Sequence, residues 1–161
     1  MYELTLLLHD IRSAHNVGSL LRSAECFGVK EVFVSGFTPY PRVPHDTRLP
    51  HIADKNTRDI QKTALGAEKT VTVTVVDNVH EFLKDYRKNH TVLALEQDTR
   101  STPLKDAWLT GNSLLIVGRE VEGLDHSIRD LCDHIFEIPM LGSKESLNVA
   151  IATSIALYQL T

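Results

Sequence analysis

Two polar residues, Ser146 and Asn148, stand directly before a long apolar segment of the chain. They belong to the stretch IPMLGSKESLNVA, residues 138–150, which continues into IATSIALYQL. A strand-like run stops at Pro139, a loop with Gly and Ser follows, and a helix is predicted to start among residues 146–148. Uncharged donors and acceptors beside a segment that must be buried indicate a binding site for a polar small molecule.

A second stretch whose residues could take part in binding or catalysis is LLIVGREVEGL, residues 114–124. In it a buried strand ends at Gly118, and a tight turn carries Glu120. Glycines at a strand end let backbone amides and carbonyls approach a ligand closely. In open parallel sheets, ligands lie beyond the carboxyl ends of the strands. We therefore expect one pocket where three predicted strands end, after Leu95, Val117 and Ile138.

The first predicted helix, at about residues 17–27, places Arg22 almost opposite its apolar stripe. Arg22 is therefore presented outward or into a cleft. Asn16 stands at the helix start, where its side chain can cap a free amide. Taken alone, capping is the simpler interpretation of Asn16, and a surface charge is the simpler interpretation of Arg22.

These helices and strands alternate along the chain. Strand patterns occur at residues 3–8, 31–35, 70–76, 91–95, 113–117 and 134–138, and helix patterns at about 17–27, 57–65, 78–88, 125–132 and the C-terminal segment. This alternation predicts an α/β fold with a mostly parallel sheet flanked by helices on both faces. The length of 161 residues predicts a single domain, residues 1–161.

The composition excludes several classes of protein. No apolar run reaches the length of a membrane span, and the N-terminus lacks a signal-peptide pattern, so we expect a cytoplasmic protein without membrane contact. The eight His form no HxxxH or HxH pair and no cluster with Cys, so no metal site is predicted. The two cysteines, Cys26 and Cys132, are predicted to be reduced core thiols.

Charge is uneven along the chain. The net charge is −4, which argues against a protein that coats nucleic acid indiscriminately, but residues 1–62 carry 8 Lys and Arg against 7 Asp and Glu. The proline-rich stretch 37–56, predicted to be a loop, contains Arg42 and Arg48. Its basic side chains suit a surface that grips phosphates, because Arg can bind them bidentately. A merely solvated loop is the alternative.

Taken together, these motifs closely resemble those of the SpoU (TrmH) family of RNA 2′-O-ribose methyltransferases. The first motif is Asn16 with Arg22, the second is Gly118-x-Glu120-x-x-Gly123, and the third runs from Ile138-Pro139-Met140 to Ser146-Leu147-Asn148. The resemblance covers nearly the whole chain, in the family's order.

The resemblance implies a fold of the SPOUT class, in which the C-terminal segment forms a deep trefoil knot that holds S-adenosylmethionine. Physical reasoning alone predicts an unknotted doubly wound sheet, because true knots are essentially absent from proteins. The family also implies a homodimer whose active sites combine residues of both subunits. The substrate implied is RNA, tRNA or rRNA, and the small size of the chain leads us to expect tRNA.

Roles for individual residues also follow from the resemblance. It implies catalytic or orienting roles for Asn16, Arg22, Glu120, Ser146 and Asn148. It implies cofactor contacts from Leu95, Glu96, Gly118, Ile138, Met140, Ser146 and Leu147. RNA contacts are expected from Arg12, Arg42 and Arg48. Because a guanidinium stays protonated at neutral pH, we expect Arg22 to hold a substrate phosphate rather than to act as the base.

Three other functions compete with this interpretation. A non-catalytic RNA-binding module of the same fold would not need the intact polar residues of the three motifs. A conventional dinucleotide-binding α/β enzyme would need a G-x-G-x-x-G turn after the first strand, and HNVGSLL offers one glycine. A hydrolase with Ser146 as nucleophile would need the G-x-S-x-G elbow, which the chain lacks around this serine.

Overall fold

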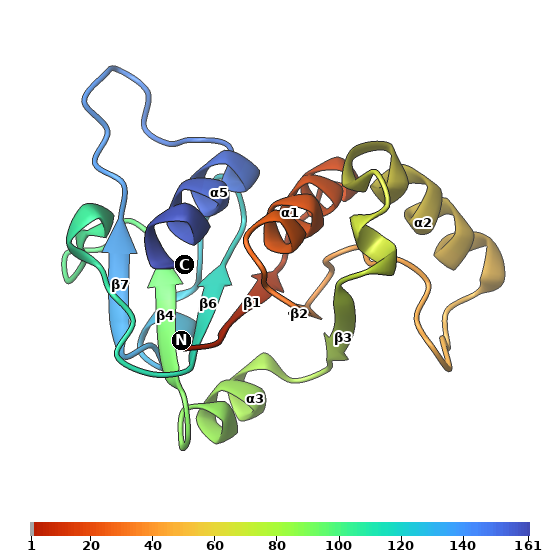
Figure 1. Cartoon of the computed structure of the whole chain (residues 1–161), viewed down its shortest axis with the longest axis horizontal. Coiled ribbons are helices and arrows are strands. Elements are labelled where there is room, and N and C mark those ends of the chain that lie inside the picture. Colours follow the sequence, from red (N-terminus) through yellow and green to blue (C-terminus); the bar gives the residue numbers. More distant parts are fainter. Residues whose placement is uncertain (1) are drawn as a thin grey trace.

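A seven-stranded sheet forms the centre of the computed structural model, which describes residues 2–161 (Figure 1). The strand order is β3-β2-β1-β6-β4-β7-β5, and neighbouring strands pair in parallel. The strands are β1 (Leu4–His9), β2 (Glu31–Ser35), β3 (Thr72–Val76), β4 (Thr91–Leu95), β5 (Thr102–Pro103), β6 (Ser113–Val117) and β7 (His134–Glu137). The predicted parallel sheet is confirmed. The short edge strand β5 was not predicted, because two residues ending in proline give no alternating pattern.

Helices cover both faces of this sheet, because its central strands are apolar on both sides. The helices are α1 (Ala14–Cys26), α2 (Pro50–Ala64), α3 (Val79–Tyr86), α4 (His126–Arg129) and α5 (Val149–Leu160), with short 3-10 turns at Ala67–Lys69 and Leu104–Asp106. Successive side chains of β1 point to opposite faces. Leu6 and Leu8 therefore pack in the core with residues of α1, α2 and α5, whereas Leu7 packs with residues of α3 and α4. Figure 1 shows α1, α2 and α5 on one side of the sheet and α3 on the other.

Several predicted boundaries were wrong. The predicted loop 37–56 ends at residue 49, because Pro50 occupies the first turn of α2, where its fixed φ and missing N–H are tolerated. Helix α1 begins at Ala14 and is capped by Ser13 rather than by Asn16. Helix α5 begins at Val149, with Asn148 as its N-cap.

The two cysteines differ in their surroundings. Cys26 lies exposed at the end of α1, so its predicted burial was wrong. Cys132 is partly buried, and this burial raises the pKa of its thiol to about 12. Neither forms a disulfide.

The strands β6, β4 and β7 are neighbours and run in parallel, so the segments that follow them lie together at the carboxyl ends of the strands, as predicted. The parallel sheet with helices on both faces agrees with the predicted fold class, and the trefoil knot stays a prediction. Within residues 2–161, no helix is long and apolar enough to cross a membrane.

Candidate functional site

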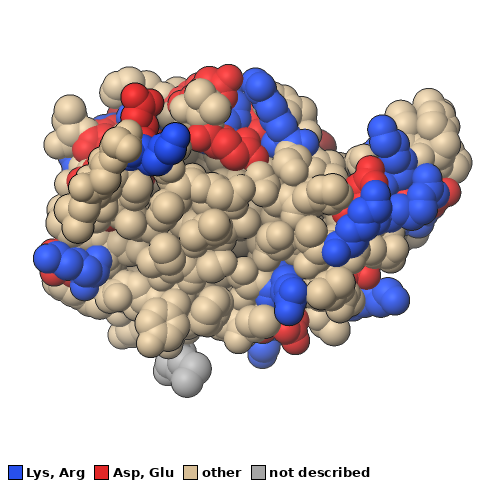
Figure 2. Space-filling model, turned by 90° about the horizontal axis from the view of Figure 1, so that it is seen from above, with Lys and Arg blue, Asp and Glu red and all other residues tan. Residues whose placement is uncertain are grey.

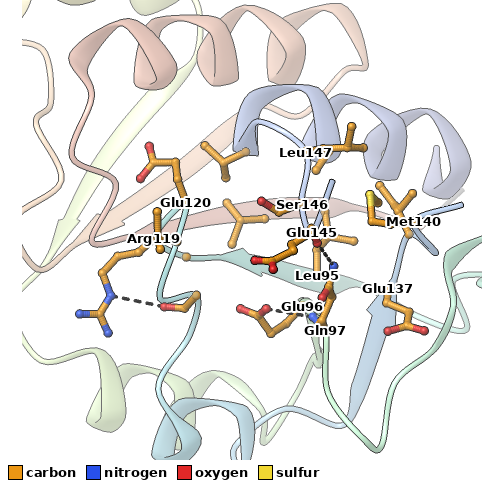
Figure 3. A pocket seen from close by; sticks show the side chains of 17 residues that line it. Leu95, Glu96, Gln97, Arg119, Glu120, Glu137, Met140, Glu145, Ser146 and Leu147 are labelled. Atoms are coloured by element: carbon orange, nitrogen blue, oxygen red, sulfur yellow. Dashed lines mark hydrogen bonds between the residues drawn. The ribbon is translucent and has the colours of Figure 1, made fainter. Parts of the chain in front are cut away.

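A pocket of about 410 Å³ lies where β4, β6 and β7 end (Figure 3). Its walls come from the segments that follow these three strands and from the start of α5. All seven predicted cofactor contacts line it: Leu95, Glu96, Gly118, Ile138, Met140, Ser146 and Leu147. The volume lies within the range of small-molecule sites. The structure therefore brings the predicted pocket together from three distant parts of the chain.

The loop after β6 is shaped by Glu96, at the end of β4. Glu96 Oε2 accepts a hydrogen bond from Leu124 N (2.8 Å). Glu96 Oε1 accepts one from Gln97 N (2.9 Å) (Figure 3). Gly123 lies against this carboxylate with a φ of +67°, and a Cβ there would fall 2.2 Å from Glu96 Oε2. Only glycine combines that backbone angle with such close approach. Glu96 thus holds one wall of the pocket in place.

The opposite wall is tied to β4 by Gln97. Its side-chain Nε2 donates a hydrogen bond to the carbonyl of Glu145 (2.7 Å) (Figure 3). This bond fastens the segment between β7 and α5 to the end of β4. Sequence reasoning missed Gln97, although it lies directly after a predicted strand end.

The pocket has an acidic lining. Four glutamates are among its lining residues: Glu96, Glu120, Glu137 and Glu145. The one basic residue in its wall, Arg119, is committed elsewhere, since its Nη2 donates to Asp125 Oδ1 (2.6 Å) and its Nε to the carbonyl of Gly123 (3.4 Å). With apolar walls and a carboxylate excess, the pocket favours a cationic ligand. Glu137 and Glu145 were not predicted, because isolated glutamates carry no motif.

Three side chains from distant motifs form a hydrogen-bonded network beside the pocket. Asn16 Nδ2 donates to Glu120 Oε1 (2.8 Å), and Asn148 Nδ2 donates to Asn16 Oδ1 (3.2 Å). Ser13 caps α1, which leaves the side chain of Asn16 for this network. Asn148 Oδ1 caps α5 by accepting from Ala150 N (2.9 Å) and Ile151 N (3.3 Å).

These bonds fix the direction of each amide. Because the oxygen of Asn148 is used by the cap, its nitrogen donates to Asn16. The oxygen of Asn16 then accepts, so its nitrogen is directed at Glu120. Glu120 also lines the pocket, and so joins the network to the cavity. Ser146 lies in the pocket wall, two residues before the capping Asn148.

Arg22 lies apart from this network. It is exposed on α1, as predicted, and forms no ion pair within residues 2–161. It follows Asn16 by six residues, about 9 Å of helix rise and two-thirds of a turn beyond a full one. Within one chain, the structure does not bring Arg22 to the pocket.

The three arginines predicted to bind RNA differ in their surroundings. Arg12 is exposed and lies 3.3 Å from Glu122 in the loop after β6. Arg42 is half-exposed and pairs with Asp54 of α2 at 2.7 Å.

Arg48 is mostly buried and binds within its own loop. Its guanidinium pairs with Asp46, donates to the carbonyls of Tyr40 (2.9 Å) and Pro41 (3.1 Å), and stacks on the Tyr40 ring at 3.5 Å. The Arg48 guanidinium holds the pKa of Asp46 well below its usual range. A phosphate contact by Arg48 would compete with these partners, and its role as an RNA contact stays a prediction.

Beyond the predicted residues, His9 at the end of β1 is buried near the same edge of the sheet. Its Nδ1 lies 2.8 Å from Ser35 Oγ, and its Nε2 lies 3.3 Å from Asp10 Oδ2. Burial lowers the pKa of His9, although Asp10 acts in the opposite direction. A lone histidine after a strand gave no signal in the sequence. No group of three or more His, Cys, Asp or Glu within residues 2–161 is arranged to hold a metal ion.

Comparison with known proteins places this site in a family. The family model described as SpoU rRNA Methylase matches residues 3–158. The chain is 33% identical over 160 residues to the 23S rRNA (guanosine-2′-O-)-methyltransferase RlmB of Haemophilus influenzae, covering 98% of this chain and 58% of that protein. The chain thus spans little more than half the length of this relative.

Solved structures share the fold. The SpoU methyltransferase AviRb from Streptomyces viridochromogenes, in complex with the cofactor AdoMet, matches with a TM-score of 0.77 and 26% identity, over 98% of this chain and 56% of that chain. The A. aeolicus TrmH/SpoU tRNA modifying enzyme matches with a TM-score of 0.78 and 23% identity, over 99% of this chain and 74% of that chain.

Proposed function

The chain belongs to the SpoU rRNA methylase family, and we propose that it transfers a methyl group from S-adenosylmethionine to a ribose 2′-hydroxyl of RNA. One observation carries the proposal: Glu120 lies in the wall of the pocket and also accepts the hydrogen bond from Asn16. The residues proposed for cofactor binding therefore meet the residues proposed for catalysis at one side chain. The names of the relatives support the same reaction.

The pocket fits S-adenosylmethionine in size and in charge. The cofactor carries a sulfonium and an ammonium group against one carboxylate, and four glutamates line the cavity. Opposite charges in a partly desolvated site attract more strongly than in water. Leu95, Ile138 and Leu147 supply apolar walls for the adenine and ribose. When bound, the cofactor would supply an electrophilic methyl group on its sulfonium, and S-adenosylhomocysteine would be the leaving group.

The chain's own residues act on the nucleophile. A hydroxyl is a poor nucleophile until its proton is removed or it is polarised. We assign to Glu120, oriented by Asn16 and Asn148, the positioning of groups around the 2′-hydroxyl, and to the Ser146 hydroxyl a hydrogen bond at the pocket wall. Arg22 holds the adjacent phosphate, which accepts or relays the proton.

A homodimer explains how Arg22 reaches the site. The exposed side chains of Ile151, Ile155 and Tyr158 follow one another at i, i+4 and i+7 on α5, with 54%, 41% and 76% of their surfaces exposed. Figure 2 views the molecule from the side of α1, α2 and α5, and it shows few charges at the centre of this face. We propose that two copies pair through this apolar stripe, and that Arg22 of one copy serves the pocket of the other.

Ribosomal RNA is the substrate we propose. The relatives that match 98% of this chain are 23S rRNA (guanosine-2′-O-)-methyltransferases. This revises the expectation of tRNA, which rested only on the small size of the chain. The chain spans only 58% of the first relative, so its activity and its substrate are both proposals. We also propose that residues 1–161 form one methyltransferase domain.

The alternative functions have weaker support. An RNA-binding module without turnover would not need the directed network of Asn148, Asn16 and Glu120. A dinucleotide-binding enzyme would have to hold a pyrophosphate, and the acidic pocket disfavours that anion. Isothermal calorimetry with S-adenosylmethionine and with NAD separates the methyltransferase from the dinucleotide-binding enzyme. We expect binding of S-adenosylmethionine alone, and binding of NAD alone would contradict the proposal.

A further inference from the structure

A narrow stripe of basic residues runs along α2, on the side opposite its buried face. His51, Lys55, Arg58 and Lys62 are spaced at i, i+4, i+7 and i+11, and all four are exposed. At 100° per residue they lie within about 60° of one another. The buried residues of α2, Ala53, Ile60 and Ala64, face the other way. We call His51, Lys55, Arg58 and Lys62 the α2 stripe.

The central charges of the α2 stripe are available to a partner. Within residues 2–161, Lys55 and Arg58 form no ion pair. Lys62 pairs with Asp59 at 2.7 Å, yet 61% of its side chain remains exposed. Figure 2 shows Lys and Arg gathered at the end of the molecule formed by α2 and the segment before it, beside the broad uncharged face. A chain with a net charge of −4 therefore concentrates positive charge here.

The α2 stripe is held rigidly with respect to the proposed catalytic residues. Helix α2 packs on α1 so closely that a Cβ at Gly18 would fall 2.3 Å from the carbonyl of Ile60. Thr63 Oγ1 also donates a hydrogen bond to the carbonyl of His15 (2.7 Å). His15 precedes Asn16 of the catalytic network. A nucleic-acid strand bound along α2 would therefore have a fixed position relative to that network.

We propose that the α2 stripe binds the phosphate backbone of the RNA substrate, and this inference rests on the proposed function. The three cations of the stripe, Lys55, Arg58 and Lys62, span about 10 Å, from the 1.5 Å rise of each helical residue, with one cation roughly every turn. Such a row suits a regularly charged polymer. Backbone contacts of this kind fix register without reading sequence.

The test compares two matched double variants. Lys55→Gln with Arg58→Gln removes the two unpaired charges of the α2 stripe and keeps good helix formers. Lys84→Gln with Lys88→Gln removes two exposed charges from α3 and from the turn that follows it, on the other face of the sheet. Binding of a 23S rRNA transcript is measured by fluorescence anisotropy from low to high salt, and S-adenosylmethionine binding by calorimetry. Thermal melting checks that both variants fold.

The α2 variant should bind the transcript about 10-fold more weakly at moderate salt, and its plot of log affinity against log salt should flatten by roughly 1.4 to 1.8. Cofactor binding should not change, and the α3 variant should match the wild type. An unchanged salt slope in the α2 variant would overturn the inference while leaving the proposed function intact. Unchanged RNA binding with weakened binding of polyglutamate would assign the stripe to an acidic protein and also overturn it. A wild-type chain that bound neither RNA nor S-adenosylmethionine would refute both proposals.

Discussion

Asn16 and Glu120, 104 residues apart in sequence, are joined by a hydrogen bond of 2.8 Å from Asn16 Nδ2 to Glu120 Oε1. The bond connects the start of α1 to the loop after β6. Asn148, at the start of α5, completes the network through Asn16. This is where the three sequence motifs meet, and it is the arrangement that the first prediction addresses.

Asn148→Ala should lower the rate of methyl transfer at least ~100-fold, because it removes the amide that orients Asn16 and Glu120. It should also cost about 1 kcal/mol of stability, since Asn148 caps α5. Asn78→Ala is the matched control, because Asn78 caps α3 in the same way, accepting from His80 N and Glu81 N. Equal losses of activity in the two variants would reduce the role of Asn148 to capping. Urea melts and initial rates measure both effects.

Arg22→Ala should retain S-adenosylmethionine binding and lose most transfer activity, and Arg22→Lys should not restore it, because Lys lacks the bidentate fork.

Mixing the Arg22→Ala and Asn148→Ala chains tests whether the two copies of a dimer share their sites. If Arg22 serves the partner's pocket, half the dimers carry one intact site and activity returns to about a quarter of wild type. No recovery after subunit exchange would place Arg22 in its own chain's site.

Gly123→Ala should weaken S-adenosylmethionine binding by roughly 10-fold or more, because the added methyl group displaces the Glu96 carboxylate that supports the pocket wall. Gly28→Ala is the control. It has a similar φ of +76°, but a Cβ there would meet nothing within 4 Å. Gly28→Ala should therefore cost about 1 kcal/mol in stability from the backbone alone. Calorimetry of both variants separates strain from loss of the pocket, and equal affinities would contradict this view of Gly123.

Stability should fall as the pH drops through about 6.5, the ordinary pKa of histidine. Burial lowers the pKa of His9 in the folded protein. The unfolded chain therefore binds more protons than the folded one, so acid favours unfolding, and the stabilising contribution is fully present only above this pH. Urea melts at pH 7.5 and 5.5 should show a smaller loss for His9→Gln than for the wild type. An equal or larger loss in the variant would show that other groups control the effect.

The sequence predicted the parallel sheet because apolar strand runs and helical stripes alternate from Leu4 to Leu160. It also predicted the pocket, since ligands in such sheets bind beyond the strand ends. Boundaries were less predictable. Pro50 resembled a loop residue but starts α2, and Asn16 resembled a cap but binds Glu120 because Ser13 caps instead.

Partners distant in sequence were not predictable from local patterns. The burial of Arg48 against Tyr40 and Asp46 depends on how its loop folds back, and spacing alone does not show this. The same holds for Glu96 under Gly123, where the interaction joins two loops. The trefoil knot, the homodimer and the cytoplasmic location came only from resemblance and composition, and they stay predictions.

The central claim is tested most directly by incubating the chain with methyl-labelled S-adenosylmethionine and 23S rRNA, and then hydrolysing the RNA in alkali. A 2′-O-methyl group blocks cleavage of its own phosphodiester bond, so we predict label in alkali-resistant dinucleotides, and its loss in Asn148→Ala. Label confined to mononucleotides with methylated bases, or no incorporation by a chain that binds both the cofactor and the RNA, would contradict the claim.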